Sequence, residues 1–202
     1  MQKPLKILHI SNGNQKFMGL RISDVGRKLN NGFARLSHDL WFFSDRDFVK
    51  FNSWLGMKSL QIPKVNAAML DTVKNFQPDL IIFGHAYYLK PETVASMREA
   101  LPQAKVALYS VDALFIEKNV NYIKSFLPYV DGVFLTTSGK VLDEFKPENG
   151  FCEFMPNPVD AALEYEESWK RDKKYDFFTA MSDKTLQLGD LRHKIPHHLQ
   201  EK

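Results

Sequence analysis

Short apolar runs alternate with longer helical stretches along the first 156 residues of this chain. The clearest run is residues 79–83, Asp-Leu-Ile-Ile-Phe, which is continuously apolar after its aspartate. A strand without polar alternation is typical of a parallel sheet, because helices cover both of its faces. Such runs alternating with helices form βαβ units. The sequence therefore predicts an α/β fold that is Rossmann-like, with a mainly parallel sheet and helices on both faces.

Six strands and their connecting helices are expected within this stretch. Ser23 is well placed to cap the first helix, and Pro91 suits the first turn of a later helix, because its missing N–H costs nothing there. The segment 45–61 has no clear pattern, although its aromatic residues indicate that it packs against the rest. The strands are expected at residues 5–11, 39–43, 79–83, 105–111, 132–136 and 151–155, and the helices at 23–36, 64–76, 91–101, 118–130 and 138–145.

The composition changes after these elements. Residues 1–156 contain a full set of strands and crossovers, whereas residues 157–174 are charged and hold few apolar side chains. We expect the first stretch to be an N-terminal Rossmann-like domain and the second an interdomain linker. Residues 175–202 begin with Tyr-Asp-Phe-Phe-Thr-Ala, which has the pattern of an opening strand. They are expected to start a further, incomplete domain.

Charge and cysteine content narrow the expected partners and compartment. The chain has 27 Lys and Arg and 24 Asp and Glu, with the two signs interspersed. Nucleic-acid-binding proteins normally gather basic residues into a stripe, so nucleic acid is not an expected partner. The single cysteine, Cys152, excludes an internal disulfide and fits a reducing compartment. No apolar run resembles a signal peptide or approaches the roughly 20 residues of a membrane span, so a cytoplasmic protein is expected.

Ligands of open parallel sheets bind at the carboxyl ends of the strands. The loop after the first strand offers Asn12, Gly13 and Arg21 as substrate-binding candidates, followed by a helix N-terminus that favours anions. A G-x-G-x-x-G fingerprint is absent, since Gly13, Gly19 and Gly26 are too widely spaced. The sequence therefore argues against a bound dinucleotide and against a dehydrogenase.

The third and fourth strands end in two candidate catalytic residues. His85 follows the third strand and Asp112 follows the fourth, and each side chain could take a proton from a hydroxyl or hold a sugar. Two structural alternatives stay open, a histidine bonded to the backbone and an aspartate that caps a helix. Thr137 and Ser138 end the fifth strand, where their hydroxyls would either bind substrate or cap a helix.

Two further clusters are weaker candidates. The Asp45-Arg46-Asp47 run after the second strand resembles the acidic position that reads a ribose, but the glycine fingerprint that should accompany it is missing. His193, His197 and His198 suggest a metal site, yet a proline interrupts the helix that would align them. No metal is therefore expected.

Residues 156–160, Pro-Asn-Pro-Val-Asp, resemble the segment by which GT-B glycosyltransferases pass from their first Rossmann domain to their second. Residues 29–40 are similar to the first helix of that family, with Ser37 in place of its usual glycine. Residues 131–138 resemble the strand and loop at the edge of the family's interdomain cleft. Asp79-Leu-Ile-Ile-Phe-Gly-His85 and Tyr109-Ser-Val-Asp112 are most similar to the CgeB-like branch of this fold.

The resemblance implies the N-terminal half of a sugar-nucleotide-dependent glycosyltransferase. In that family the first domain binds the acceptor, a glycan, lipid-linked or protein molecule, while the second domain holds the donor. Asn157 then becomes a further substrate-binding candidate. No cofactor is implied, because the sugar nucleotide is a substrate. We expect little activity from this chain alone, and cell-envelope polysaccharide biosynthesis is the pathway that the resemblance implies.

Other classes of function remain open. A non-catalytic module would use the same sheet edge to bind a sugar or a nucleotide. An interaction module would use exposed apolar surface to bind another protein, and any surface left without its second domain is expected to cause self-association. Peripheral contact with a membrane is a further alternative.

Overall fold

The computed structural model describes residues 3–15, 25–53 and 56–174. Residues up to Tyr165 belong to one compact unit, and Glu166–Lys202 belong to a second, of which the structure describes residues 166–174. The boundary between the units falls inside the predicted linker at 157–174. The second unit contributes one short 3₁₀ helix to the described residues, η5 (Ser168–Lys170).

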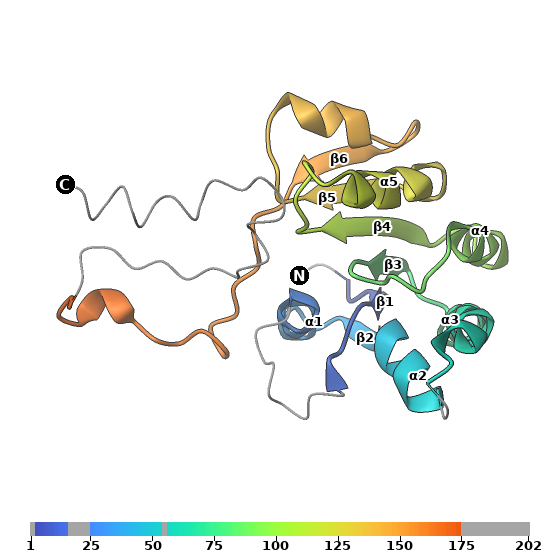
Figure 1. Cartoon of the computed structure of the whole chain (residues 1–202), viewed down its shortest axis with the longest axis horizontal. Helices are drawn as coiled ribbons and strands as arrows, with labels where there is room; N and C mark the ends of the chain where they lie inside the picture. The colour runs from blue at the N-terminus through green and yellow to red at the C-terminus, as the bar shows by residue number, and fades with distance from the viewer. Residues whose placement is uncertain (1–2, 16–24, 54–55, 175–202) are drawn as a thin grey trace. The chain divides into compact units, whose positions relative to one another are not determined.

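The first unit is built on a six-stranded sheet in the order β2-β1-β3-β4-β5-β6 (Figure 1). Every neighbouring pair is parallel, which confirms the predicted α/β, Rossmann-like fold. The apolar runs of the central strands β1, β3 and β4 are almost entirely buried, whereas the edge strands β2 and β6 are largely half-buried or exposed. The strands are β1 (Lys6–Ile10), β2 (Asp39–Phe43), β3 (Leu80–Phe83), β4 (Lys105–Ser110), β5 (Gly132–Leu135) and β6 (Phe151–Phe154).

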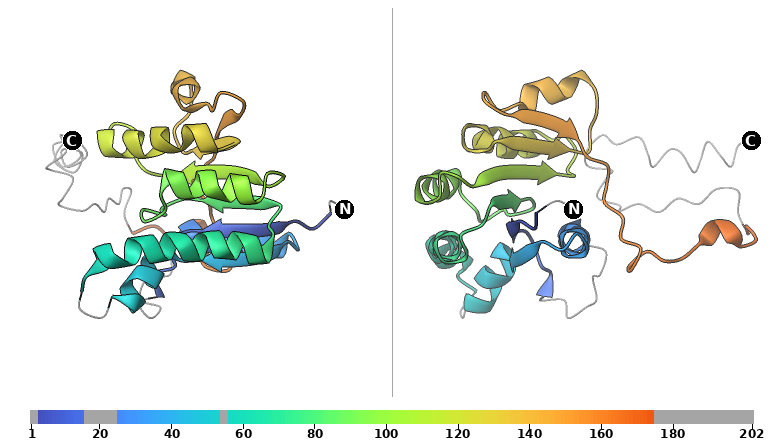
Figure 2. Two further views of the ribbon diagram at one scale, coloured as in Figure 1. Left: turned by 90° about the vertical axis from the view of Figure 1, so that its right-hand side faces the viewer. Right: turned by 180° about the vertical axis from the view of Figure 1, so that it is seen from behind.

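The connecting helices lie on both sides of the sheet, as predicted. Helices α3, α4 and α5 run side by side over one face, and α1 lies on the other (Figure 2). The helices are α1 (Val25–Arg35), α2 (Asp45–Asn52), α3 (Ile62–Phe76), α4 (Pro91–Ala100) and α5 (Glu117–Phe126), with 3₁₀ helices η2 (Lys58–Gln61), η3 (Leu127–Tyr129) and η4 (Lys140–Phe145).

Alternate residues of each strand enter two unequal cores. Leu8 and Phe83 are among the buried side chains of the larger core, which lies under α3, α4 and α5. Ile7, Ala107 and Tyr109 belong to the smaller core, against which α1 packs with its apolar side chains. Within the described residues, α1 is the only helix whose side chains pack against this second core. The described residues therefore leave much of that face of the sheet uncovered.

Two of the predicted helices differ from the structure, and the segment left unassigned is helical. The helix expected at 118–130 ends at Phe126, because Pro128 lacks the N–H that would continue the α-helical ladder and begins a 3₁₀ turn instead. The helix expected at 138–145 is a 3₁₀ helix that begins at Lys140. The unassigned segment 45–61 contains α2 and η2.

Two aspartates hold neighbouring strands together at the amino edge of the sheet. Asp79 accepts a hydrogen bond from the backbone N–H of Lys6 at 2.8 Å, so it ties β3 to β1. Asp131 accepts one from the N–H of Val106 at 2.8 Å and also pairs with Arg98 of α4 at 2.8 Å. These carboxylates bond backbone donors that the short strands leave unpaired at this edge.

A third aspartate anchors the chain after β6. Asp160 is buried and accepts hydrogen bonds from Asn31 at 2.6 Å, from Ala162 N–H at 2.8 Å, and from Arg35. These hydrogen bonds, with that of Asn31 the strongest influence, lower the pKa of Asp160. The bonds to Asn31 and Arg35 fix residues 156–160 against α1, the helix on the less covered face of the sheet.

Candidate functional site

The loops after β3 and β4 bring the two predicted catalytic residues together. His85 Nδ1 lies 3.8 Å from Asp112 Oδ2, and both side chains are partly exposed. His85 has a backbone φ of 54°, in the left-handed region. That conformation is uncommon for residues other than glycine and is concentrated at functional sites. The pair therefore occupies the edge of the sheet at which parallel α/β folds bind ligands.

Neither structural alternative for these residues is realised in the described part of the chain. Nε2 of His85 is buried there without a hydrogen-bond partner. Helix α5 has Ile116 at its N-cap, so Asp112 does not cap it. Instead the backbone N–H of Asp112 donates to Ser110 Oγ at 3.2 Å, which holds the loop after β4. Both polar side chains therefore have capacity left for a ligand.

Tyr87 completes this group and was missed by sequence reasoning. Its hydroxyl donates to Asp112 Oδ2 at 2.8 Å, and its ring centroid lies 6.2 Å from that of His85. Burial, followed by the neighbouring Asp112 carboxylate, raises the pKa of Tyr87 to about 12. Tyr87 is therefore a permanent donor at neutral pH. Its position two residues after His85 in the same loop was the available signal.

Helix α2 reaches the same loop through Asp45 and Arg46. The buried carboxylate of Asp45 accepts hydrogen bonds from the N–H of Tyr88 at 2.8 Å and from the N–H of Arg46 at 2.7 Å. Burial raises the pKa of Asp45 to about 6, although both hydrogen bonds act to lower it. The guanidinium carbon of Arg46 lies 4.4 Å from the centroid of the Tyr87 ring. Asp45 and Arg46 thus shape the His85 loop, whereas Asp47 contacts Ser44 and the loop after β1.

The loop after β1 is occupied by contacts within the protein. The N–H of Gly13 donates to Ser44 Oγ at 2.9 Å, and Asn12 donates to Asn14 Oδ1 at 3.0 Å. A Cβ added at Gly13 would lie 2.9 Å from Asp47 Oδ2, so the loop approaches α2 too closely for a larger residue. Gly13 therefore fixes the loop, with its N–H already bonded. The remaining candidate of this loop, Arg21, lies outside the described residues.

The other predicted substrate-binding residues are not joined to the His85–Asp112 pair. Thr137 is half-buried and Ser138 is exposed, both directly after β5, and Asn157 is exposed beyond β6. Among the described residues, no hydrogen bond or ion pair connects these three to His85 or Asp112. Thr137 and Ser138 still lie at the carboxyl edge of the sheet, because β5 pairs in parallel with β4.

A buried polar row supports the pair from inside the sheet. The Tyr109 hydroxyl donates to Ser11 Oγ at 2.9 Å and lies 3.1 Å from His9 Nε2. Burial lowers the pKa of His9 to about 4, so this histidine is neutral at physiological pH. The Tyr109 ring also lies 6.3 Å, centroid to centroid, from the His85 ring. Ser11 and His9 therefore hold the Tyr109 ring, which lies next to His85.

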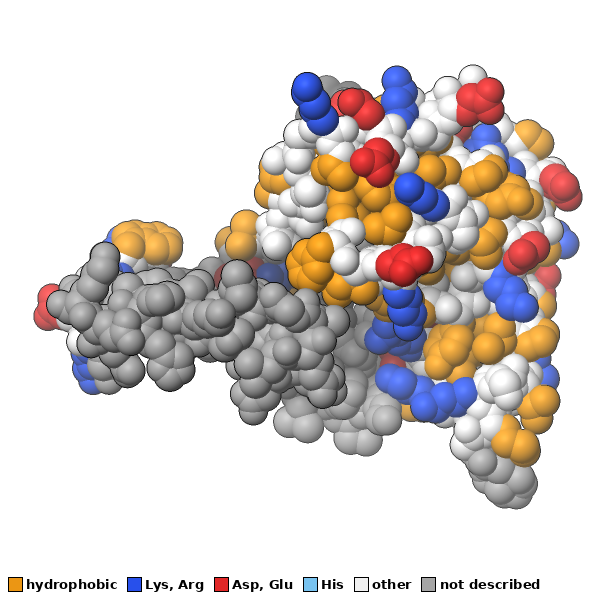
Figure 3. Space-filling view, turned by 45° about the horizontal axis from the view of Figure 1, so that its top comes forward, with side chains coloured by type: hydrophobic (Ala, Val, Ile, Leu, Met, Phe, Trp, Pro, Cys, Tyr) orange, Lys and Arg blue, Asp and Glu red, His pale blue; other side chains and the backbone are white. Residues whose placement is uncertain are grey.

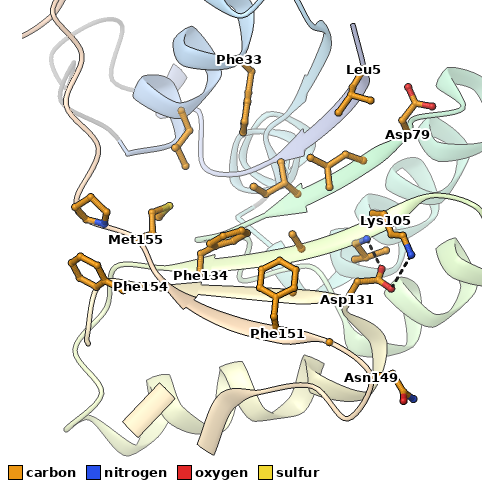
Figure 4. Close-up of a pocket in the computed structure, with 18 residues that line it drawn as sticks. Leu5, Phe33, Asp79, Lys105, Asp131, Phe134, Asn149, Phe151, Phe154 and Met155 are labelled. Carbon is orange, nitrogen blue, oxygen red and sulfur yellow. Dashed lines mark hydrogen bonds and ion pairs between the residues drawn. The ribbon is translucent and has the colours of Figure 1, made fainter. Parts of the chain in front are cut away.

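A large apolar groove lies elsewhere on the sheet. It has a volume of about 980 Å³, and Phe33 of α1 lines one wall while strand residues form its floor (Figure 4). The groove runs from the amino edge, at Asp79 and Asp131, to Phe154 beside the end of β6. His85 and Asp112 are not among its lining residues. The His85–Asp112 pair and the apolar groove are therefore separate features of this unit.

No known protein-family model matches the sequence, and a search of curated proteins finds no relative. Any functional argument for this chain therefore rests on its residues and their geometry.

Metal and membrane sites were also sought. Across residues 3–15, 25–53 and 56–174, no cluster of three His, Cys, Asp or Glu side chains could hold a metal ion. In the same described ranges, the structure holds no helix whose length and apolar character would let it cross a bilayer. His193, His197 and His198, the histidines considered for a metal site, lie outside these ranges.

Proposed function

We propose that this chain is the acceptor-side domain of a sugar-nucleotide-dependent glycosyltransferase of the GT-B type. The single observation that carries the proposal is the His85–Asp112 pair at the carboxyl edge of a parallel sheet. Sugar transfer requires a base that takes a proton from the attacking hydroxyl of the acceptor. A histidine next to a carboxylate is a common arrangement for that task.

The proposal gives each side chain of the pair a role. The Asp112 carboxylate, 3.8 Å from Nδ1 of His85, favours a proton on that nitrogen of the neutral ring. Nε2 then has its lone pair available, and the described residues leave it without a partner. Nε2 is buried in this structure, so the proposed reaction includes a shift of the His85 loop that lets the acceptor hydroxyl reach it. Nε2 then accepts the hydroxyl proton, while Asp112 stabilises the positive charge that forms on the ring. Tyr87 holds the Asp112 carboxylate in position.

Residues 156–160 give the proposal independent support. In the GT-B pattern the chain leaves the first domain here, and the crossing segment must be fixed to that domain. Asp160, the last residue of the segment, is bound by Asn31 and Arg35 of α1. Its neighbour Glu164 pairs with Lys28 at 2.6 Å, also on α1. The aspartate of the motif thus has a structural reason to be there.

The proposal is tested by calorimetric titration with short glycans, nucleotides and sugar nucleotides. We expect glycans to bind without a nucleotide, and His85→Ala and Asp112→Asn each to weaken that binding about tenfold to a hundredfold, because hydrogen bonds to charged or polar ligand groups are lost. Glu144→Gln, at an exposed position on η4, is the control and should bind as the unchanged protein does. Nucleotide binding without glycan binding would contradict the proposal.

The apolar groove favours a second candidate, an interaction module that associates with a second copy of itself. Leu5 and Phe154 are exposed within the groove, and its rim carries Lys105 beside Asp79 and Asp131. A rim with both signs of charge is self-complementary across a two-fold axis. Figure 3 shows hydrophobic side chains that reach the surface between charges of both signs.

This candidate is tested by light scattering across a concentration series. We expect the protein to form dimers, and Phe154→Asp to shift the dissociation constant at least about tenfold toward monomers, because a carboxylate would be buried at the interface. Phe51→Asp changes an equally apolar, exposed residue of α2 outside the groove and should leave the dimer intact. A monomer at all concentrations, or equal effects of the two substitutions, would exclude the candidate.

A further inference from the structure

Arg46 lies against the His85 loop and has no carboxylate partner in the described residues. It is half-exposed, and its guanidinium lies over the Tyr87 ring with 4.4 Å between Cζ and the ring centroid. By contrast, Arg35 is paired with Asp160 and Arg98 with Asp131. The ring therefore positions the Arg46 side chain without neutralising its charge.

The two carboxylates near Arg46 are both engaged with other donors. Asp45 accepts hydrogen bonds from the backbone N–H groups of Tyr88 and of Arg46 itself. Asp112 accepts the hydroxyl of Tyr87 and faces His85. Neither carboxylate forms an ion pair with the Arg46 guanidinium, so within the described part of the chain its N–H donors are open to a ligand.

The Tyr87 ring on which Arg46 stacks is itself held in place. Its ring centroid lies 5.5 Å from that of Tyr122, and the Tyr122 hydroxyl donates to the carbonyl of Ala86 at 3.2 Å. Together with the bond from Tyr87 to Asp112, these contacts fix both ends of the Tyr87 side chain. An arginine stacked on a rigid ring is oriented before a ligand arrives, which reduces the entropy lost on binding.

We infer that Arg46, stacked on Tyr87, is an anion subsite beside the His85–Asp112 pair, so that the molecule bound there carries a carboxylate or a phosphate. A planar guanidinium binds either group through two parallel hydrogen bonds. That the ligand is a sugar rests on the proposed function. If that function holds, the acceptor is an acidic saccharide, either a uronic acid or a sugar phosphate. The anion subsite itself does not depend on sugar transfer.

Calorimetric titration of the whole chain with glucose, glucuronate, glucose 6-phosphate and inorganic phosphate tests the inference. We expect at least one acidic sugar to bind about tenfold more tightly than glucose, with an advantage that decreases as salt is added. Arg46→Gln should abolish this advantage. Arg46→Lys keeps the charge but loses the planar guanidinium with its paired donors, so it should retain the advantage only in part. Arg27→Gln, at an exposed position of α1, should leave it unchanged. The preferred acidic sugar identifies phosphate or carboxylate as the natural group.

Equal affinity for glucose and both acidic sugars, or an acidic preference that survives in Arg46→Gln, would overturn the inference. Neutral glycans whose binding depends on His85 would in that case still support the proposed function. Conversely, inorganic phosphate that binds through Arg46 while no sugar binds would support the anion subsite and contradict the acceptor role. An absence of binding by every anion would refute the subsite.

Discussion

The Gly84→Ala variant is expected to lose about 3 kcal/mol of its free energy of unfolding, the upper end for an overpacked core. A Cβ at this position would lie 2.5 Å from Cε2 and Cζ of Tyr109, well inside van der Waals contact. The Tyr109 ring cannot move aside easily, because it is fully buried and its hydroxyl is bonded to Ser11 and close to His9. Urea denaturation followed by circular dichroism measures the loss.

The chain provides a matched control for this substitution. Gly32 lies within α1, and a Cβ added there would meet no atom within 4 Å. Gly32→Ala should raise the free energy of unfolding by about 0.5–1 kcal/mol, because alanine restricts the unfolded chain and favours the helix. Similar effects of the two substitutions would show that Tyr109 does not restrict the space at Gly84.

The second large effect is a pair of opposing pH dependences that belong to His9 and Asp45. Burial lowers the pKa of His9 from 6.5 to about 4, so the unfolded chain binds a proton that the folded chain does not. The stability contributed by neutral His9 is therefore lost as the pH decreases from 6.5 toward 4. Because one pKa unit corresponds to about 1.4 kcal/mol, this loss is on the order of 3 kcal/mol.

Asp45 acts with the opposite sign over an overlapping range. Burial raises its pKa from 3.8 to about 6, so the folded chain binds a proton that the unfolded chain does not. Ionised Asp45 costs stability above pH 6, and this cost is removed as the pH decreases toward 4, again by an amount on the order of 3 kcal/mol. In the unchanged protein the two contributions largely cancel.

Single substitutions should separate these contributions in denaturation curves recorded between pH 4.5 and 7.5. The His9→Gln variant keeps a group that can bond Tyr109 but does not titrate, so its stability should increase on acidification relative to the unchanged protein. The Asp45→Asn variant should show the reverse, a steeper decrease. Curves for both variants that run parallel to that of the unchanged protein would show that neither residue titrates differently in the folded state.

The strands were predictable because they correspond to short, continuous runs of apolar residues. The run at residues 79–83 became β3, and Asp79, at its start, ties that strand to β1. Helix α2 was missed even though Ser44 and Asp47 form the spacing of a capping box. The Ser44 hydroxyl bonds both the N–H and the carboxylate of Asp47, at 3.3 and 2.6 Å.

The site was only partly predictable, because contacts between loops depend on how the crossovers stack. The sequence placed His85 and Asp112 after strands at the same edge of the sheet, and their proximity follows from the pairing of β3 with β4 in the structure. The position of Arg46 over Tyr87 was not predictable, since it depends on the path of the segment between β2 and α3. The groove was likewise not predictable, because Phe134 and Phe151 have the pattern of ordinary core residues and line an open groove only where the described residues leave that face uncovered.

The two edges of the sheet have different roles, one in holding the strands together and the other in carrying the candidate site. Asp79 and Asp131 fasten neighbouring strands at the amino edge, whereas the loops that carry His85, Tyr87 and Asp112 emerge at the opposite edge. Substitutions in those loops therefore leave the register of the strands intact. A protein built this way can acquire a new ligand preference by exchanging a few loop side chains, and the same separation makes the fold a tolerant scaffold for engineering.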